Sequence, residues 1–83
     1  MAPGFYMHEN AMDVCLEVIS VSHSDLKRIN VKARWWNLGY VGNPYCITPQ
    51  IETITIDNAD ALKWHTLTNR QLHTARLAPG FPA

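Results

Sequence analysis

The strongest constraint on the fold of this chain is the run of residues 27–36, in which apolar and polar side chains alternate with period two. A period of two is the repeat of a β-strand that buries one face. One face carries Ile29, Val31, Ala33 and Trp35, and the opposite face carries Arg28, Lys32, Arg34 and Trp36. We therefore predict a strand that directs Trp35 into the core and Trp36 outward.

Residues 12–22 alternate in the same way and predict another strand. One face carries Val14, Leu16 and Val18, and the other carries Asp13, Cys15 and Glu17. Because only a short stretch of turn-forming residues separates the two runs, we expect them to pair as an antiparallel hairpin. The acidic side chains then lie on the same side as the basic ones of the next strand, which predicts cross-strand ion pairs.

The remainder of the chain predicts short elements. Glycines and an Asn-Pro pair in residues 37–44 favour a turn, and residues 45–48 and 52–56 predict two further strands. Residues 57–62 predict a helix start with an aspartate cap. We favour a single helical turn before a last strand over residues 63–67, and the alternative is a helix that runs to about His65. Together these elements indicate an all-β fold class with one short helical turn, arranged as a small curled antiparallel barrel that is SH3-like or OB-like.

A chain of 83 residues is long enough for a single domain. We expect an N-terminal arm over residues 1–11, a small β-barrel domain over residues 12–67 and a C-terminal tail over residues 68–83. The tail has three possible courses: it lies over the body, extends to a neighbouring molecule or is disordered.

Charge and composition bear on the class of partner. The seven basic and seven acidic residues cancel, which disfavours a dedicated nucleic-acid binder, since phosphate neutralisation supplies most of the affinity of such proteins. Charged residues make up 17% of the chain, below the usual share of about 25%. This low charge favours a surface partly covered by the termini, by a second copy or by a protein partner.

The candidate protein-binding residues are Trp36, Tyr40 and Tyr45. An outward Trp beside two Tyr side chains offers a contact surface, and both residue types are enriched at binding hot spots because they bury large areas at a small entropic cost. The alternative is that Trp36 packs under the turn or under the N-terminal arm.

Lys32, Arg34 and Trp36 are the candidate residues for a second function, the binding of single-stranded nucleic acid. A basic and aromatic strand face can contact phosphates and stack on bases. The competing interpretation is a solvated strand face that Asp13 and Glu17 neutralise, and the zero net charge favours it.

No catalytic residue, metal ligand or cofactor is predicted. The two cysteines and four histidines lack the close ligand pairs of a zinc site, and no phosphate loop or nucleophile motif is present. We expect two reduced thiols and a cytoplasmic protein, with no signal peptide, no transmembrane segment and no membrane partner.

The sequence thus predicts a non-enzymatic protein-interaction module or small assembly subunit, of the kind found among phage or mobile-element accessory proteins. It would bind a protein partner, or its own copies, through the aromatic turn. Two alternatives stay open: a single-stranded nucleic-acid-binding barrel, and an oligomeric barrel whose copies share a ligand or active-site pocket.

Overall fold

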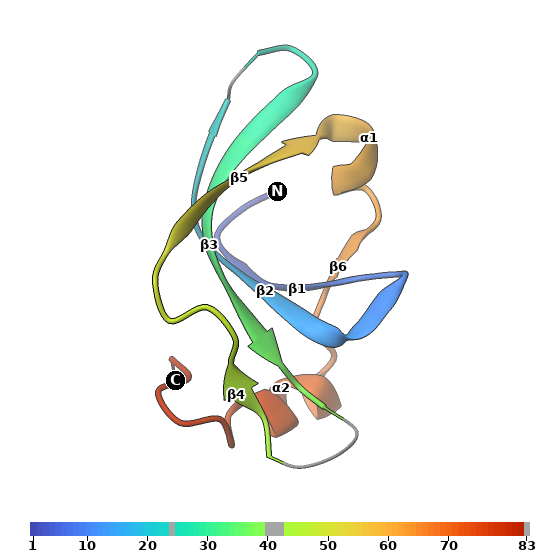
Figure 1. The fold of residues 1–83 in the computed structure, drawn as a ribbon. Helices are drawn as coiled ribbons and strands as arrows, with labels where there is room; N and C mark the ends of the chain where they lie inside the picture. The colour runs from blue at the N-terminus through green and yellow to red at the C-terminus, as the bar shows by residue number, and fades with distance from the viewer. Residues whose placement is uncertain (24, 40–42, 83) are drawn as a thin grey trace.

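In the computed structural model, residues 1–23, 25–39 and 43–82 are described. The fold is mostly antiparallel β-sheet with a small helical part, as the alternating patterns predict (Figure 1). The elements in chain order are β1 (Gly4–His8), β2 (Ala11–His23), β3 (Arg28–Asn37), β4 (Tyr45–Cys46), β5 (Glu52–Asp57), α1 (Asn58–Ala61), β6 (Trp64–Thr66) and α2 (Asn69–Ala75).

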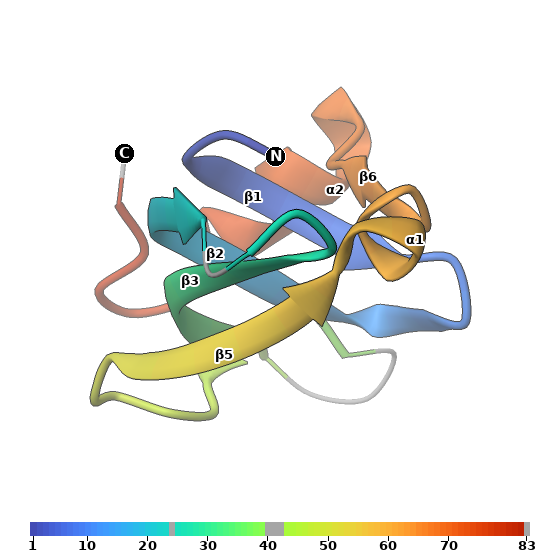
Figure 2. The same ribbon diagram turned by 90° about the horizontal axis from the view of Figure 1, so that it is seen from above.

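The strands form one sheet in the order β4-β3-β2-β1-β6, and β5 pairs with β3 on the same side as β4. Every pairing is antiparallel, and β2 and β3 form the predicted hairpin, in which Leu16 lies opposite Trp35. The sheet curls strongly, so that β5, α1 and β6 turn toward one another (Figure 2). Within the described ranges β5 and β6 are not paired, and the sheet is open between them.

The N-terminal segment is a strand and not the predicted arm. β1 lies between β2 and β6 and pairs with both. Its side chains alternate between the two faces of the sheet, because Tyr6 packs on one side while Phe5 and Met7 pack on the other. A stretch of five residues is too short for its period to stand out in the sequence, whereas its two neighbours in the sheet fix it in place.

Inside the curl lies an apolar cluster that we call the inner cluster. Its buried members are Leu16, Val18, Ile29, Val31, Ala33 and Ile56, with Tyr6, Val21, Trp35, Ile54, Ala61 and Trp64 packed against them. This confirms that Trp35 packs with Leu16, Val31 and Ile54. Val14, which alternation placed in the same set, is only half-buried and lies outside the cluster.

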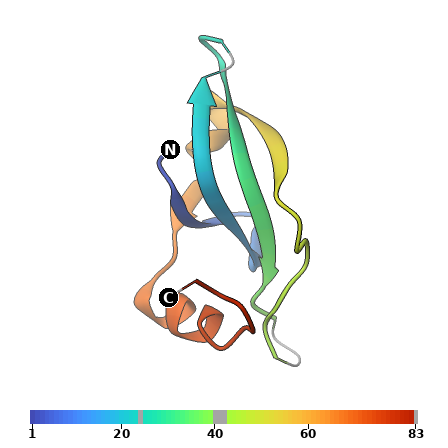
Figure 3. The ribbon, with the colours of Figure 1, turned by 90° about the vertical axis from the view of Figure 1, so that its left-hand side faces the viewer.

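A second apolar cluster, the outer cluster, lies on the opposite face of the sheet. It consists of Met7, Cys15, Trp36, Leu38, Ala75 and Ala78, with Phe5, Cys46, Leu67 and Phe81 packed against them. The tail therefore takes the first of its three courses and lies over the body, with α2 and the segment after it at one end of the sheet (Figure 3).

A capping box begins α2. The Thr68 side chain accepts a hydrogen bond from the Gln71 N–H, and the Gln71 side chain accepts one from the Thr68 N–H. Neither α1 nor α2 has the length and apolar character that a bilayer crossing requires of a helix.

Candidate functional site

Trp36, the central residue of the predicted protein-binding surface, is buried rather than exposed to solvent. Only 1% of its surface is accessible, and its ring packs edge-on against Phe81 with centroids 5.0 Å apart. Alternation assigned Trp36 to the correct face of the sheet, but that face is covered by a distant part of the chain. The covering segment is the C-terminal tail, and the prediction that Trp36 is exposed for binding is wrong.

A buried carboxylate holds Trp36 and Arg34 together on the same face. Glu17 is 8% exposed, and its Oε1 accepts the Trp36 indole N–H at 2.9 Å. Arg34 donates to both carboxylate oxygens, with Nε–Oε1 at 3.0 Å and Nη2–Oε2 at 3.1 Å, and its guanidinium lies 5.4 Å from the Trp36 ring centroid. These contacts confirm the predicted cross-strand ion pair. The positive charge of Arg34 is therefore paired with Glu17 within the protein.

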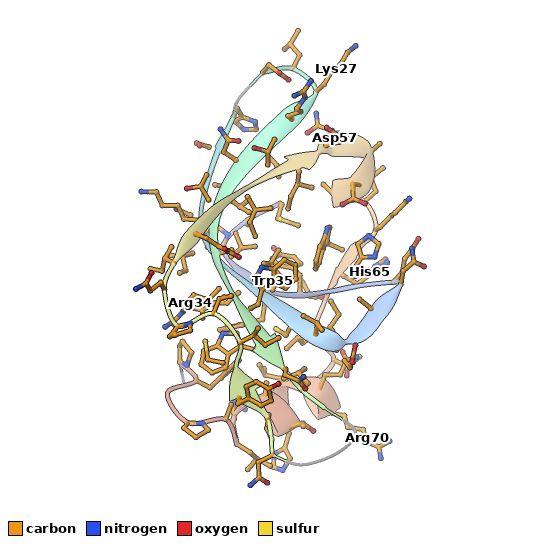
Figure 4. All side chains as sticks on the ribbon, in the orientation of Figure 1. Lys27, Arg34, Trp35, Asp57, His65 and Arg70 are labelled. Carbon is orange, nitrogen blue, oxygen red and sulfur yellow. The ribbon has the colours of Figure 1, made fainter. Side chains whose placement is uncertain are left out.

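The predicted nucleic-acid stripe is therefore not assembled as a free surface. Of its three residues, Lys32 is exposed, whereas Arg34 pairs with Glu17 and Trp36 is buried. Figure 4 shows Arg34 outside the curl of the sheet and Trp35 inside it. A single exposed lysine on this face provides neither a row of phosphate contacts nor an aromatic ring for base stacking.

Of the two tyrosines in the predicted surface, Tyr40 lies outside the described residues and Tyr45 is 54% exposed on β4. Two other large apolar side chains of the same segment, which were not among the predicted binding residues, are also exposed. These are Ile47, 42% exposed, and Ile51, 55% exposed. We call Tyr45, Ile47 and Ile51 the apolar ridge, and it is the candidate functional site.

The backbone of Trp35 fixes the position of the ridge. Its N–H donates to Thr48 Oγ1 at 2.8 Å, and its carbonyl accepts the N–H of Ile47 at 2.8 Å. Cys46, between the two exposed side chains, points inward and packs on the outer cluster. The chain therefore leaves β4 with Tyr45 and Ile47 on the solvent side, and it is tied to β3 while it does so.

The ridge also lacks charge. Residues 43–51 contain no Asp, Glu, Lys, Arg or His. Depletion of charged residues together with retention of Tyr is typical of the core of protein interfaces. The absence of charge is visible in the sequence, whereas the predicted protein-binding residues include only Tyr45 from this segment.

On the open side of the sheet, two indoles are held by carboxylates. Trp35 Nε1 donates to Glu52 Oε1 at 2.9 Å, and Trp64 Nε1 donates to Asp60 Oδ2 at 3.2 Å. The two rings lie 5.8 Å apart between centroids. Because both indole N–H groups already have acceptors, this arrangement orients the two rings rather than offering free donors to a ligand.

Asp60 also contacts His8, whose Nε2 lies 3.2 Å from Asp60 Oδ1. This hydrogen bond is the main reason that the pKa of Asp60 is lowered from its ordinary value, and desolvation by burial acts in the opposite direction. The hydrogen bond from Trp64 acts in the same direction. The carboxylate is thereby held ionised, as a structural contact between β1, α1 and β6.

The remaining reactive side chains do not form a catalytic or metal-binding group. Burial raises the pKa of the Cys15 thiol to about 12, so it stays protonated and unreactive near neutral pH. Both cysteines are free thiols. Within the described part of the chain, no three His, Cys, Asp or Glu side chains come close enough to share a metal ion.

No protein-family model matches this chain, and no curated protein or solved structure is significantly similar to it.

Proposed function

We propose that this chain is a non-catalytic interaction module that binds another protein through the apolar ridge of Tyr45, Ile47 and Ile51. The observation that carries the proposal is the exposure of these three side chains, 54%, 42% and 55%, within one uncharged segment. Removing such side chains from water contributes about 25 cal/mol per Å² of apolar area. A partner with an uncharged, largely apolar surface is the chemistry that the ridge would recognise.

The segment that carries the ridge is already ordered in the unbound chain. The hydrogen bond from the Trp35 N–H to Thr48 Oγ1 and the contact of Cys46 with the outer cluster restrain the segment on both sides of Ile47. A segment that is already ordered loses less conformational freedom when it binds. This restraint supports a binding surface over a loop that merely connects two strands.

We further propose that the curled sheet is an incomplete barrel of the SH3-like type. What supports this is the order of its last elements, since β5 is followed by the single turn of α1 and β6 then pairs with β1. An OB-like arrangement has less support, because the helical turn precedes the last strand. Binding residues are often carried by the segments that connect strands, which agrees with the position of the ridge, from Tyr45 on β4 to Ile51 just before β5.

Site-specific photo-crosslinking tests the proposed function. A benzophenone amino acid in place of Ile47 should crosslink to one discrete partner in cells that naturally contain the chain, while the same group in place of the exposed Lys63 should not. The crosslink should be lost when Tyr45→Ser and Ile51→Ser are added. Equal labelling at both positions, or a crosslink that survives these substitutions, would remove the ridge as the binding site.

The same variants show whether the ridge belongs to the core instead. Substitutions at exposed positions normally change the free energy of unfolding by no more than about 0.5 kcal/mol each. We therefore expect Tyr45→Ser and Ile51→Ser to keep the stability of the wild-type chain within that range. A large loss of stability in urea denaturation would show that these side chains support the fold.

A further inference from the structure

One backbone hydrogen bond shows how β5 is oriented in the sheet. The N–H of Asn58, next to β5, donates to the carbonyl of Lys27 at 2.8 Å, and the register of β5 with β3 continues from there without a shift. In an antiparallel ladder, the residues that exchange hydrogen bonds with the partner strand recur at every second position. Ile54 and Ile56 therefore direct their backbone groups toward β3.

The intervening residues of β5 have the opposite orientation. Thr53 and Thr55 direct their N–H and C=O groups away from β3, and Asp57 directs its N–H the same way. Among the described residues, β3 is the one strand that pairs with β5, so this row of groups lies along the free edge of the sheet. Figure 3 shows β5 as the outermost strand at that side of the molecule.

The centre of β5 lacks the features that protect edge strands from pairing, and its charged residues, Glu52 and Asp57, lie at the two ends of the strand. Soluble proteins commonly place Lys, Pro or a β-bulge on such an edge. The sequence of β5 is Glu-Thr-Ile-Thr-Ile-Asp, with no Lys or Pro, and its pairing with β3 has no bulge. An unprotected edge with alternating β-branched side chains is suited to pair with another strand.

We propose that β5 pairs in antiparallel fashion with β5 of a second copy of this chain, about a two-fold axis beside Thr55. In this register Thr55 exchanges hydrogen bonds with Thr55 of the partner subunit, and the carbonyl of Thr53 accepts the N–H of Asp57 of the partner subunit. The two curled sheets become one continuous sheet. The proposal goes beyond the proposed function, because it concerns a different surface and a different partner from those of the ridge.

The side chains of β5 are self-complementary in this register, which is why a second copy is the favoured occupant. Ile54 lies opposite Ile56 of the partner subunit on the face that packs inward, and the threonines and Asp57 lie on the other face. No two like charges are directly opposed. A closed dimer requires the same patch to complement itself about a two-fold axis, and the Ile-Thr-Ile centre of β5 satisfies that requirement.

Sedimentation equilibrium of the full chain tests the dimer. The wild-type chain should show a monomer–dimer equilibrium, and Thr55→Pro should raise its dissociation constant about tenfold or more, because proline removes the central outward N–H. The ladder with β3 does not use that N–H, so the fold should survive, as judged by circular dichroism. Thr55→Val, the matched control, keeps the N–H and should dimerise like the wild type.

Two results of this experiment would overturn the proposal: a wild-type chain that stays monomeric at every concentration, or a control variant that dissociates as readily as Thr55→Pro. Should the proline variant fail to fold, Thr55→Lys replaces it. That substitution places two like charges opposite each other at the axis, and a weakening of up to about fivefold is expected.

Cysteine crosslinking tests the register. With Thr55→Cys, the two introduced thiols lie on a hydrogen-bonded pair, whose Cα atoms are about 5.5 Å apart, within the distance that a disulfide spans. With Thr53→Cys, the two thiols are displaced by about 13 Å along the strands and should not join. Mild oxidation should therefore link Thr55→Cys chains faster than Thr53→Cys or wild-type chains, and equal rates would exclude this register. Failure here leaves the ridge unaffected, since its variants are tested with a different partner.

Discussion

The inner and outer clusters lie back to back on one sheet but are closed in different ways. The inner cluster is closed by the sheet, whose curl brings β5, α1 and β6 around it (Figure 2). The outer cluster is closed by a segment outside the sheet, α2 and the residues after it. Closure by the sheet follows from regular alternation, whereas closure by a distant segment depends on contacts that no single strand specifies. Because α2 and the residues after it cover the outer cluster, Trp36 is not free to bind a partner.

Replacing the adjacent tryptophans of β3 should give the largest change in the free energy of unfolding, and the two losses compare the outer cluster with the inner cluster. Trp36→Ala should reduce the free energy of unfolding by about 3–5 kcal/mol, because it leaves a large cavity under the tail. Trp35→Ala should cost less, about 1–3 kcal/mol, because Trp35 is only half-buried at the open side of the inner cluster. Urea denaturation measures both changes. A smaller loss for Trp36→Ala than for Trp35→Ala would contradict the burial of Trp36.

A chain of this length has a total stability of roughly 4–12 kcal/mol, so Trp36→Ala alone can unfold it. Trp36→Phe serves as the milder variant, since its ring fills most of the space while the indole N–H that Glu17 accepts is removed. We expect it to remain folded and to lose about 1–2 kcal/mol.

Two carboxylates that accept indole N–H groups allow a second test of the clusters. Glu17→Gln should cost about 1.5–3 kcal/mol, because it removes the charge that Arg34 and Trp36 share in a buried site. Glu52→Gln is the matched variant at the inner cluster, where the carboxylate is exposed. It should cost less than about 0.5 kcal/mol. Equal losses in urea denaturation would show that burial does not separate the two contacts.

Phe81→Ala tests the cover of the outer cluster. Its ring contacts Phe5 at 4.5 Å and Trp36 at 5.0 Å between centroids, so we expect a loss of about 1–2 kcal/mol. Pro82→Ala, at the exposed neighbouring position, should have no measurable effect. Thermal unfolding followed by tryptophan fluorescence reports both variants. No change with Phe81→Ala would mean that the tail does not hold the outer cluster closed.

The smallest predicted effect concerns the pH dependence of stability at the open side of the inner cluster. Hydrogen bonding by His8 lowers the pKa of Asp60 from 3.8 in the folded state. The ionised carboxylate therefore stabilises the fold above pH 3.8, and this contribution is lost as the pH falls through the lowered pKa. Solvent screens the contact, so Asp60→Asn should cost less than about 1 kcal/mol near neutral pH.

Acid titration of stability checks this prediction. The difference between wild type and Asp60→Asn should shrink toward zero at the acid end of the titration. Glu9→Gln, at the exposed contact of Glu9 with His65, provides the control and should show no such difference. A difference that persists after Asp60 is protonated would assign the effect to packing rather than to charge.

The sequence predicted correctly those elements of the fold that depend on local contacts. The alternation in residues 27–36 predicted β3 and the inward position of Trp35. The helical turn over residues 58–61 was also predicted, but the Asp57 side chain makes no capping hydrogen bond there. β1 was missed because a five-residue stretch is too short to display its period, and its position depends on two partner strands. Among the described residues β5 and β6 are not paired, so the sheet is curled but open rather than closed into the predicted barrel. How far a sheet curls depends on all of its strands together and is not visible in the pattern of any one of them.

The candidate site was predicted less well than the fold. Tyr45 is exposed as expected, but Trp36 is buried under residues some forty positions away in the sequence, as the contact with Phe81 shows. The alternation predicts on which face of the sheet a side chain lies, but it does not predict which part of the chain covers that face. The better signal for the ridge was the absence of charge around Ile47, which requires no knowledge of the tertiary structure.

The cover of the outer cluster has a consequence for the order of folding. Met7 and Cys15 meet Ala75 and Ala78 there, and contacts between residues so far apart in the sequence form late, because closing a long loop costs chain entropy. The β2–β3 hairpin needs no such closure. We therefore expect the indole of Trp36 to become buried after that of its neighbour Trp35, so that fluorescence of single-tryptophan variants would report two successive steps in the kinetics of folding.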